Sequence, residues 1–180
     1  MRIPALTITA LTITALSALA AAIAPTLASE ADTAAADIAD ADGAVIGKAT
    51  FERTPTGVLM SVDVSGLPPG GHGIDLHAVG SCTPSFKAAT GHINPGKARH
   101  GLRNLEGPDN GDLSNLFAAA DGTAKAEYFT TRVSVSGGNM PALLDEDGSA
   151  VIVHDNPDDH MAQPIGDAGG RIGSGIIGEI

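Results

Sequence analysis

Apolar and polar residues alternate in short segments from residue 44 onward, the period-two pattern of β-strands that bury one face. Turn residues separate the segments, as in Thr54-Pro55-Thr56-Gly57, and Asp-Gly pairs at 121–122 and 147–148 mark two further turns. The predicted strands cover 45–53, 58–65, 72–79, 116–119, 124–130, 150–154 and 171–180, with a short apolar pair at 143–144. About eight short strands without helical periodicity predict a sandwich or barrel of Greek-key type.

Two long segments interrupt this alternation. Gly, Pro, Asn and His accumulate between residues 80 and 113, and a second polar, Gly-rich stretch follows His154. A loop of more than 30 residues is uncommon in a compact domain unless it serves a function. We therefore expect the functional residues on these two loops.

The first 28 residues have the pattern of an export signal. Arg2 carries the only charge, an apolar run follows, and Thr26-Leu27-Ala28 supplies small residues for cleavage. A membrane anchor is the alternative, because the run approaches the length that spans a bilayer; its many Thr and Ala residues favour cleavage. We predict a signal peptide at 1–28, a flexible Ala/Asp-rich leader at 29–43 and one folded domain at 44–180 of a periplasmic or secreted protein, without stable membrane association after cleavage.

The chain is acidic, with a net charge of -11 and a pI near 4.7. It offers no basic stripe that could neutralise phosphates, so nucleic acids and anionic lipids are not expected partners.

Histidines gather at the two irregular segments. Five of the six lie there, at His72, His77, His92, His100 and His154, and three carboxylates accompany them at Asp75, Asp109 and Asp112. Imidazole and carboxylate groups are ligands for zinc or copper. For each histidine alone, a solvated surface residue is the favoured interpretation, and the sixth, His160, is expected to be one. Their grouping favours a metal site.

Six ordered segments resemble the bacterial copper/zinc superoxide dismutases. They are HGIDLH (72–77), GHINP (91–95), KARHG (97–101), GPDNGDL (107–113), VIVH followed by DD (151–159) and GGRIGSGIIG (169–178). The resemblance covers residues 44–180 and implies an all-β, eight-stranded flattened Greek-key barrel with two long functional loops. Dimers are common in that family, so a homodimer is an expectation that the sequence leaves open.

The resemblance also implies roles for individual residues. His77, His92 and His154 match copper ligands, and His92 also matches the imidazolate that bridges copper and zinc. His100 and Asp112 match zinc ligands, Asp158 the carboxylate that links the two sites, and Arg171 the arginine that guides superoxide to copper. His72 matches a packing histidine.

Three positions depart from the family pattern. Asp75 stands where the family has a copper histidine, Asp109 where it has a zinc histidine, and Ser174 where a cysteine would pair with Cys82, the only cysteine in the chain. Carboxylate is a harder ligand than imidazole and disfavours Cu(I), so we expect weakened copper binding and impaired dismutation. Two imidazoles and two carboxylates still suit zinc.

Three functional hypotheses follow from these departures. The first is an altered superoxide dismutase, and the second is a non-catalytic zinc- or copper-binding protein on the same scaffold. The third uses Asp75, His77, His92 and His154, whose three imidazoles and one carboxylate are also the ligand set of iron and manganese dismutases. Acidic residues around Arg171 favour the second hypothesis, since they would repel an anionic substrate.

Overall fold

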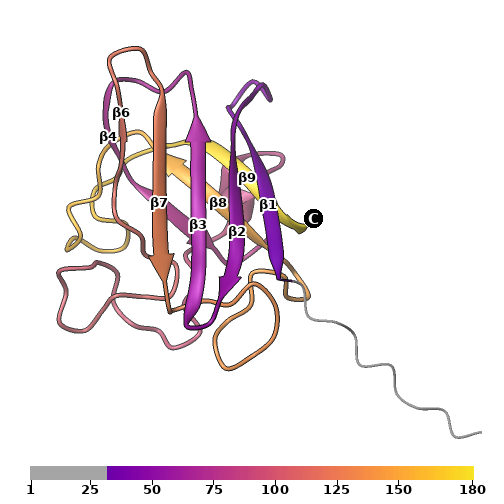
Figure 1. Cartoon of the computed structure of the whole chain (residues 1–180). Coiled ribbons are helices and arrows are strands. Elements are labelled where there is room, and N and C mark those ends of the chain that lie inside the picture. The colour runs from indigo at the N-terminus through magenta and orange to yellow at the C-terminus, as the bar shows by residue number, and fades with distance from the viewer. Residues whose placement is uncertain (1–31) are drawn as a thin grey trace, which may run out of the picture.

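The fold consists of nine β-strands and one short 3₁₀ helix within residues 32–180, the part of the chain that the computed structural model describes (Figure 1). The strands are β1 (Thr33–Ala39), β2 (Val45–Thr54), β3 (Gly57–Val64), β4 (Gly70–His72), β5 (Ile74–His77), β6 (Leu116–Ala118), β7 (Ala124–Thr130), β8 (Ser149–His154) and β9 (Arg171–Glu179), and the helix is η1 (Phe86–Ala89). The predicted signal peptide at 1–28 lies outside the described residues.

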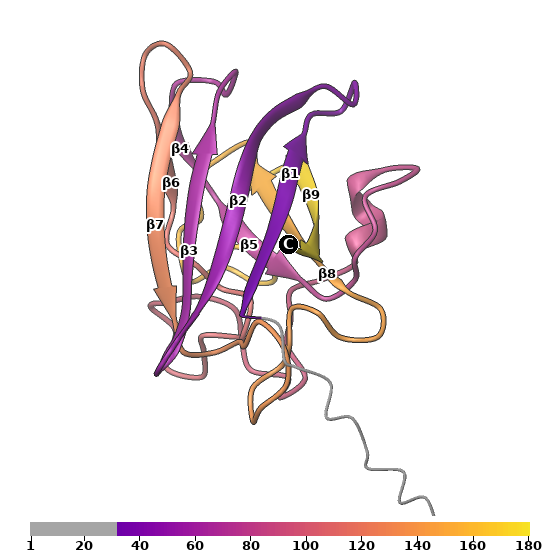
Figure 2. The ribbon, with the colours of Figure 1, turned by 45° about the vertical axis from the view of Figure 1, so that its right-hand side comes forward.

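Seven strands form one antiparallel sheet in the order β5-β8-β9-β1-β2-β3-β7, while β4 pairs with β6. The sheet curls, so that β8 and β9 lie behind β2 and β3 and the core fills the space between them (Figures 1 and 2). The predicted all-β fold is confirmed. No helix within residues 32–180 is long and apolar enough to cross a membrane.

Strand β3 shows how the alternation in the sequence becomes a core. Val58, Met60, Val62 and Val64 are buried, whereas the residues between them face outward to varying extents. Successive side chains of a strand point to opposite faces, so one face of β3 packs inward and the other meets solvent. The strand and the turn before it lie where the pattern predicts them.

The prediction of a flexible leader at 29–43 is wrong for the residues of β1. This strand pairs with β2 on one side and with β9 on the other, and its Ala34, Ala36 and Ile38 belong to the core. The composition suggested too little apolar surface to order the segment, but small side chains fit where two neighbouring strands supply the hydrogen bonds. The folded domain therefore begins before residue 44.

The predicted strand at 72–79 is two strands. β4 and β5 flank Gly73 and join different sheets, β4 pairing with β6 and β5 with β8. A Cβ atom at Gly73 would lie 3.0 Å from the Ala168 side chain, so a glycine suits the crossing between the sheets. This division and the additional strand β1 give nine strands, because the apolar pair predicted at 143–144 lies in a turn.

Strands β5 and β8 are buried on both faces, which sets them apart from β3. One face carries Ile74, Leu76, Val151 and Val153 into the core. On the other face, Ala150 and Ile152 pack with Ala89 of η1, so the loop after β5 covers this side of the sheet. Side chains on the covered face are shielded from water, and the candidate site lies there.

Candidate metal centre

Alternation along β5 places two ligand-type side chains on the covered face. Ile74 and Leu76 point into the core, so Asp75 and His77, each offset by one residue, point to the opposite side. Both are almost fully buried, with 2% and 0% of their surfaces exposed. His154 joins them from the end of β8, the strand that pairs with β5.

The long loop docks on the free edge of β5 and brings its own ligand-type residues to this face. The Leu76 amide donates to the Gly111 carbonyl at 3.0 Å, and the Ile93 amide donates to the Leu76 carbonyl at 2.9 Å. A Cβ atom at Gly111 would lie 2.2 Å from the Leu76 carbonyl oxygen, so only glycine permits this approach. His92 and Asp112 thereby come to lie opposite His77 and Asp75.

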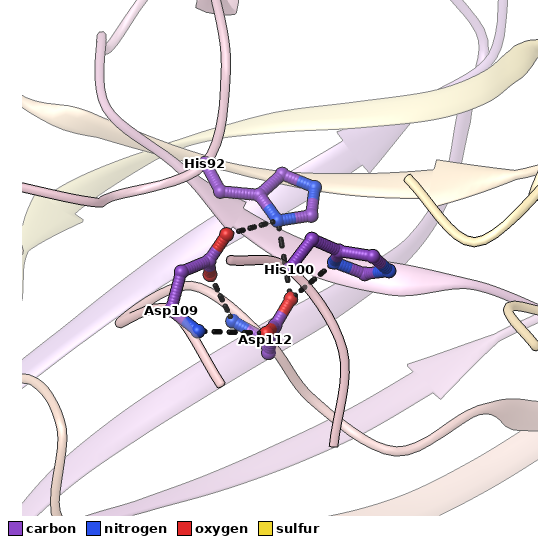
Figure 3. Close-up of side chains that lie close together, drawn as sticks. All are labelled: His92, His100, Asp109 and Asp112. Carbon is purple, nitrogen blue, oxygen red and sulfur yellow. Dashed lines mark hydrogen bonds and ion pairs between the residues drawn. The ribbon is translucent and has the colours of Figure 1, made fainter. Parts of the chain in front are cut away.

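Four loop residues form the first cluster: His92, His100, Asp109 and Asp112 (Figure 3). The Nδ1 atom of His92 lies 3.1 Å from Asp109 Oδ2 and 3.3 Å from Asp112 Oδ1, and His100 Nδ1 lies 2.6 Å from the same Asp112 oxygen. One donor atom from each residue lies within 4.8 Å of the others. This set of two imidazoles and two carboxylates is a tetrahedral zinc set.

Asp75, His77 and His154 form the second cluster, whose donor atoms also lie within 4.8 Å of one another. His92 stands between the clusters: its Nδ1 faces the first, and its Nε2 lies 3.7 Å from Asp75 Oδ2. His154 Nε2 lies 3.7 Å from the same oxygen. The structure thus brings the residues of the predicted metal sites together in two adjoining groups.

Backbone and arginine contacts hold the carboxylates of the first cluster. Asp112 Oδ2 accepts hydrogen bonds from the amides of Gly101 and Asp109, at 2.8 and 2.9 Å. Arg132 donates from Nε to the Asp109 carbonyl at 3.1 Å and from Nη2 to the Asp112 carbonyl. Arg132 has no place in the predicted site, because its contact runs through backbone oxygens that a sequence pattern does not mark.

Asp158 contacts the first cluster, one of the two sites that its predicted role would link. Its Oδ1 accepts a hydrogen bond from His100 Nε2 at 3.1 Å, and Asn115 holds its backbone through bonds in both directions. The prediction that His160 is a solvated residue is wrong: its side chain is 12% exposed, and its Nδ1 lies 2.9 Å from Asp158 Oδ2. The short turn between the two residues folds the imidazole back on the carboxylate.

Burial and neighbouring charges divide the pKa values of the site. Burial lowers the pKa of His77 to about 2 and that of His154 to about 4, so both imidazoles are neutral. Burial also acts to lower the pKa of His92 and His100, but hydrogen bonds to carboxylates outweigh it and raise both pKa values to about 10. His92 bonds to Asp109 and Asp112, and His100 bonds to Asp112 and Asp158. A cation at the first cluster would therefore displace protons.

Asp75 has a raised pKa of about 7, and burial is the largest cause. The charge of His92 lowers this pKa and the carboxylate of Asp158 raises it, each by less than burial does. A carboxylate in this position is stabilised when a positive charge arrives beside it.

Arg171 lies beside the second cluster, in a cavity of about 430 Å³ that His77 and His92 also line. Its guanidinium donates to the carbonyl oxygens of Phe86 and Thr90 at 2.6 and 2.5 Å. The arginine thus ties β9 to the loop that covers β5. Its predicted role in guiding superoxide is untested by this geometry.

Cys82 is partly buried, and its Sγ contacts the Oγ of Ser174 on β9. The two positions that the family resemblance pairs as a disulfide are therefore neighbours in space. The bond itself is absent, because position 174 carries a hydroxyl.

Comparison with known proteins finds one matching family model, described as "Copper/zinc superoxide dismutase (SODC)", over residues 45–177. The superoxide dismutase [Cu-Zn] of Caulobacter vibrioides is 49% identical over 139 residues, which cover 76% of this chain and 80% of that protein.

Solved structures agree with this comparison. A double mutant of a SOD-like protein from Bacillus subtilis has a TM-score of 0.76 at 34% identity, covering 79% of this chain and 95% of that one. The Cu/Zn superoxide dismutase from Brucella abortus has a TM-score of 0.65 at 26% identity, covering 80% and 98%.

Proposed function

Because the chain belongs to the copper/zinc superoxide dismutase family, we propose that it is a metal-binding member in which Asp75 replaces a copper histidine and impairs dismutation. The observation that carries this proposal is the place of Asp75. Its carboxylate lies within the second cluster, with His92 and His154 nitrogens 3.7 Å away, and not at the protein surface.

The four-residue cluster fits the zinc that the family implies. His92 and His100 offer Nδ1 atoms, Asp109 and Asp112 offer one oxygen each, and all four are aimed at one another. Zinc accepts this ligand set, and Asp112 is already fixed by two backbone amides. Zinc would hold the loop on β5 without taking part in electron transfer.

The Asp75 cluster fits the family's copper less well. Copper supplies the electron exchange of dismutation by alternating between Cu(I) and Cu(II). A carboxylate ligand stabilises Cu(II) much more than Cu(I). Asp75 also has no N–H group to donate to Asp158, whose Oδ1 is taken by His100. The carboxylate that matches the family's link between the two sites therefore accepts a ligand hydrogen bond from the first cluster.

A non-catalytic metal-binding role, in the periplasm or outside the cell, is the second candidate. Exposed Asp155, Asp159 and Asp167 lie on the loop between β8 and β9, close in sequence to Arg171. An anion approaching along this loop meets negative charge, the reverse of an electrostatic funnel. Zinc or copper storage requires no such funnel.

Dismutation by the copper-loaded chain tests the proposal. We expect wild-type protein loaded with one copper and one zinc to remove superoxide at least 100-fold more slowly than the Caulobacter vibrioides enzyme loaded in the same way. Asp75→His should raise the rate, while Asp63→Asn, a substitution at an exposed aspartate of β3 outside both clusters, should leave it unchanged. Equal rates for wild type and the Caulobacter vibrioides enzyme would overturn the proposal.

A further inference from the structure

The second cluster and the ring nitrogen of His92 that faces it include four buried donor atoms without a hydrogen-bond partner among residues 32–180. They are Asp75 Oδ1, His77 Nε2, His92 Nε2 and His154 Nε2. A buried polar atom without a partner costs free energy, and native proteins rarely leave even one of them unpaired. Four that gather at one place indicate a bound group that all of them contact.

Two of these imidazoles are held in the orientation of metal ligands. His77 Nδ1 lies 3.0 Å from the Thr90 carbonyl oxygen, and His154 Nδ1 lies 3.2 Å from the Gly169 carbonyl oxygen. A carbonyl accepts only, so each Nδ1 carries the proton and each Nε2 presents a lone pair to the cluster. Histidines that bind metal usually donate their other ring N–H to a carbonyl or carboxylate in this way.

The charge of the cluster favours a divalent cation. Asp75 is 2% exposed, and within the described chain its ion pairs are formed only with His92 and His154, not with lysine or arginine. Arg171 is nearby, but its guanidinium is bonded to two carbonyl oxygens. With a metal ion on His92 Nδ1, an ionised Asp75 has no cationic group of the described chain paired with it and needs a positive charge from outside.

We propose that Asp75, His77, His92 and His154 form a second zinc site, so that the chain binds two zinc ions instead of one zinc and one copper. The inference rests on the proposed function, since both start from the carboxylate at position 75. Three imidazoles and one carboxylate are a ligand set that zinc accepts, and zinc has no monovalent state for the carboxylate to disfavour. His92 presents one ring nitrogen to each ion.

Metal stoichiometry tests this inference without an activity assay. The full-length chain is produced in medium with equal zinc and copper, and native mass spectrometry with elemental analysis counts the ions on each folded molecule. We expect two zinc ions on wild type and one on Asp75→Asn, which keeps the side-chain shape but removes the charge. Asp63→Asn, the same change at an exposed aspartate outside both clusters, should retain two, and thermal unfolding confirms that each variant is folded.

Titration of metal-free protein provides the second measurement. With Co²⁺ as a spectroscopic substitute for zinc, wild type should show two tetrahedral binding events. Asp75→Asn should weaken one of them by more than the 10–100-fold typical of removing a group that hydrogen-bonds to a metal ligand. Cu(I), offered with a competing chelator, should bind Asp75→His at least 10-fold more tightly than wild type.

Several outcomes would overturn the second zinc site. They are a single zinc on wild type, copper, iron or manganese in the second position, or equal stoichiometry for wild type and Asp75→Asn. None of these decides the proposed function, which depends on the superoxide rate of protein loaded deliberately with copper. A slow copper-loaded enzyme with one zinc would preserve the proposed function and exclude this inference.

Discussion

The Sγ atom of Cys82 contacts the Oγ atom of Ser174, although 92 residues separate them in the sequence. The contact joins the loop that covers β5 to the last strand of the sheet. Both side chains are already directed at one another, so a cysteine at position 174 would place two sulfur atoms where a disulfide can form.

Ser174→Cys should therefore form a disulfide with Cys82 and stabilise the domain. A cross-link over so long a segment typically contributes about 2–5 kcal/mol, since it removes entropy from the unfolded chain. Thiol titration should find no free thiol in the oxidised variant, and its free energy of unfolding should fall to the wild-type value after reduction. Ser174→Ala serves as the control, and two free thiols in the oxidised variant would contradict the prediction.

Much of the candidate site can be predicted from the sequence, because the spacing of neighbouring residues determines where their side chains lie. Asp75 and His77 are two residues apart on a strand, which places them on one face whatever the rest of the chain does. The loop residues are recognisable because imidazole and carboxylate groups collect where the strand pattern stops. Figure 3 shows the four of them meeting as the ordered segments imply.

The missed features have no local signal. Ala34 and Ala36 of β1 are buried because strands later in the sequence pack beside them. The small side chains of the segment alone predicted that it would be flexible. Arg132 reaches the first cluster through two backbone carbonyl oxygens. Any side chain with a suitable donor could make such contacts, so the residue type gives no signal. Their roles emerge only from the tertiary arrangement.

Arg132 should affect zinc binding although it touches no ion. Its guanidinium bonds the carbonyl oxygens of Asp109 and Asp112 together, so Arg132→Ala frees the turn that carries both carboxylates. We expect a 10–100-fold loss of zinc affinity, measured by competition with a chelator. Arg132→Lys should show a similar loss, since an ammonium group does not reproduce the planar fork.

Lys125→Ala is the control for this pair. Lys125 is exposed and pairs with Asp63 on the outer side of the sheet, and neither residue belongs to the zinc cluster. The substitution removes the same charge and should leave zinc affinity unchanged. A loss of affinity in Lys125→Ala equal to that in Arg132→Ala would attribute the effect to net charge.

Gly166 should tolerate no side chain. A Cβ atom there would lie 1.5 Å from Asp158 Oδ1 and 3.0 Å from His100 Nε2, and the residue has a φ of +57°. Gly166→Ala should therefore displace Asp158, destabilise the domain by about 1–3 kcal/mol and weaken zinc binding. Gly170→Ala, where a Cβ meets nothing within 4 Å, should change neither the unfolding free energy nor the zinc affinity. Equal effects of the two substitutions would show that the contact is unimportant.

Asp75 should make the stability of the metal-free protein depend on pH. Its pKa is about 7 when folded and 3.8 ordinarily, so between these values the folded state holds a proton that the unfolded state has released. The stability that this proton contributes is fully present below about pH 4. It falls by up to about 1.4 kcal/mol per pH unit as the pH rises, and it is lost once the pH has passed 7.

Asp75→Asn removes this titration while it keeps the side-chain shape. We expect the stability of wild type relative to Asp75→Asn, measured by urea unfolding with a chelator present, to decline from pH 4 to pH 7 and to be constant above it. With saturating zinc, wild type should be more stable than Asp75→Asn at neutral pH, because the ionised carboxylate then has a cation beside it. A difference that stays flat across this range would mean that Asp75 is ionised without the cation, and hence that its burial is relieved by groups of the chain itself.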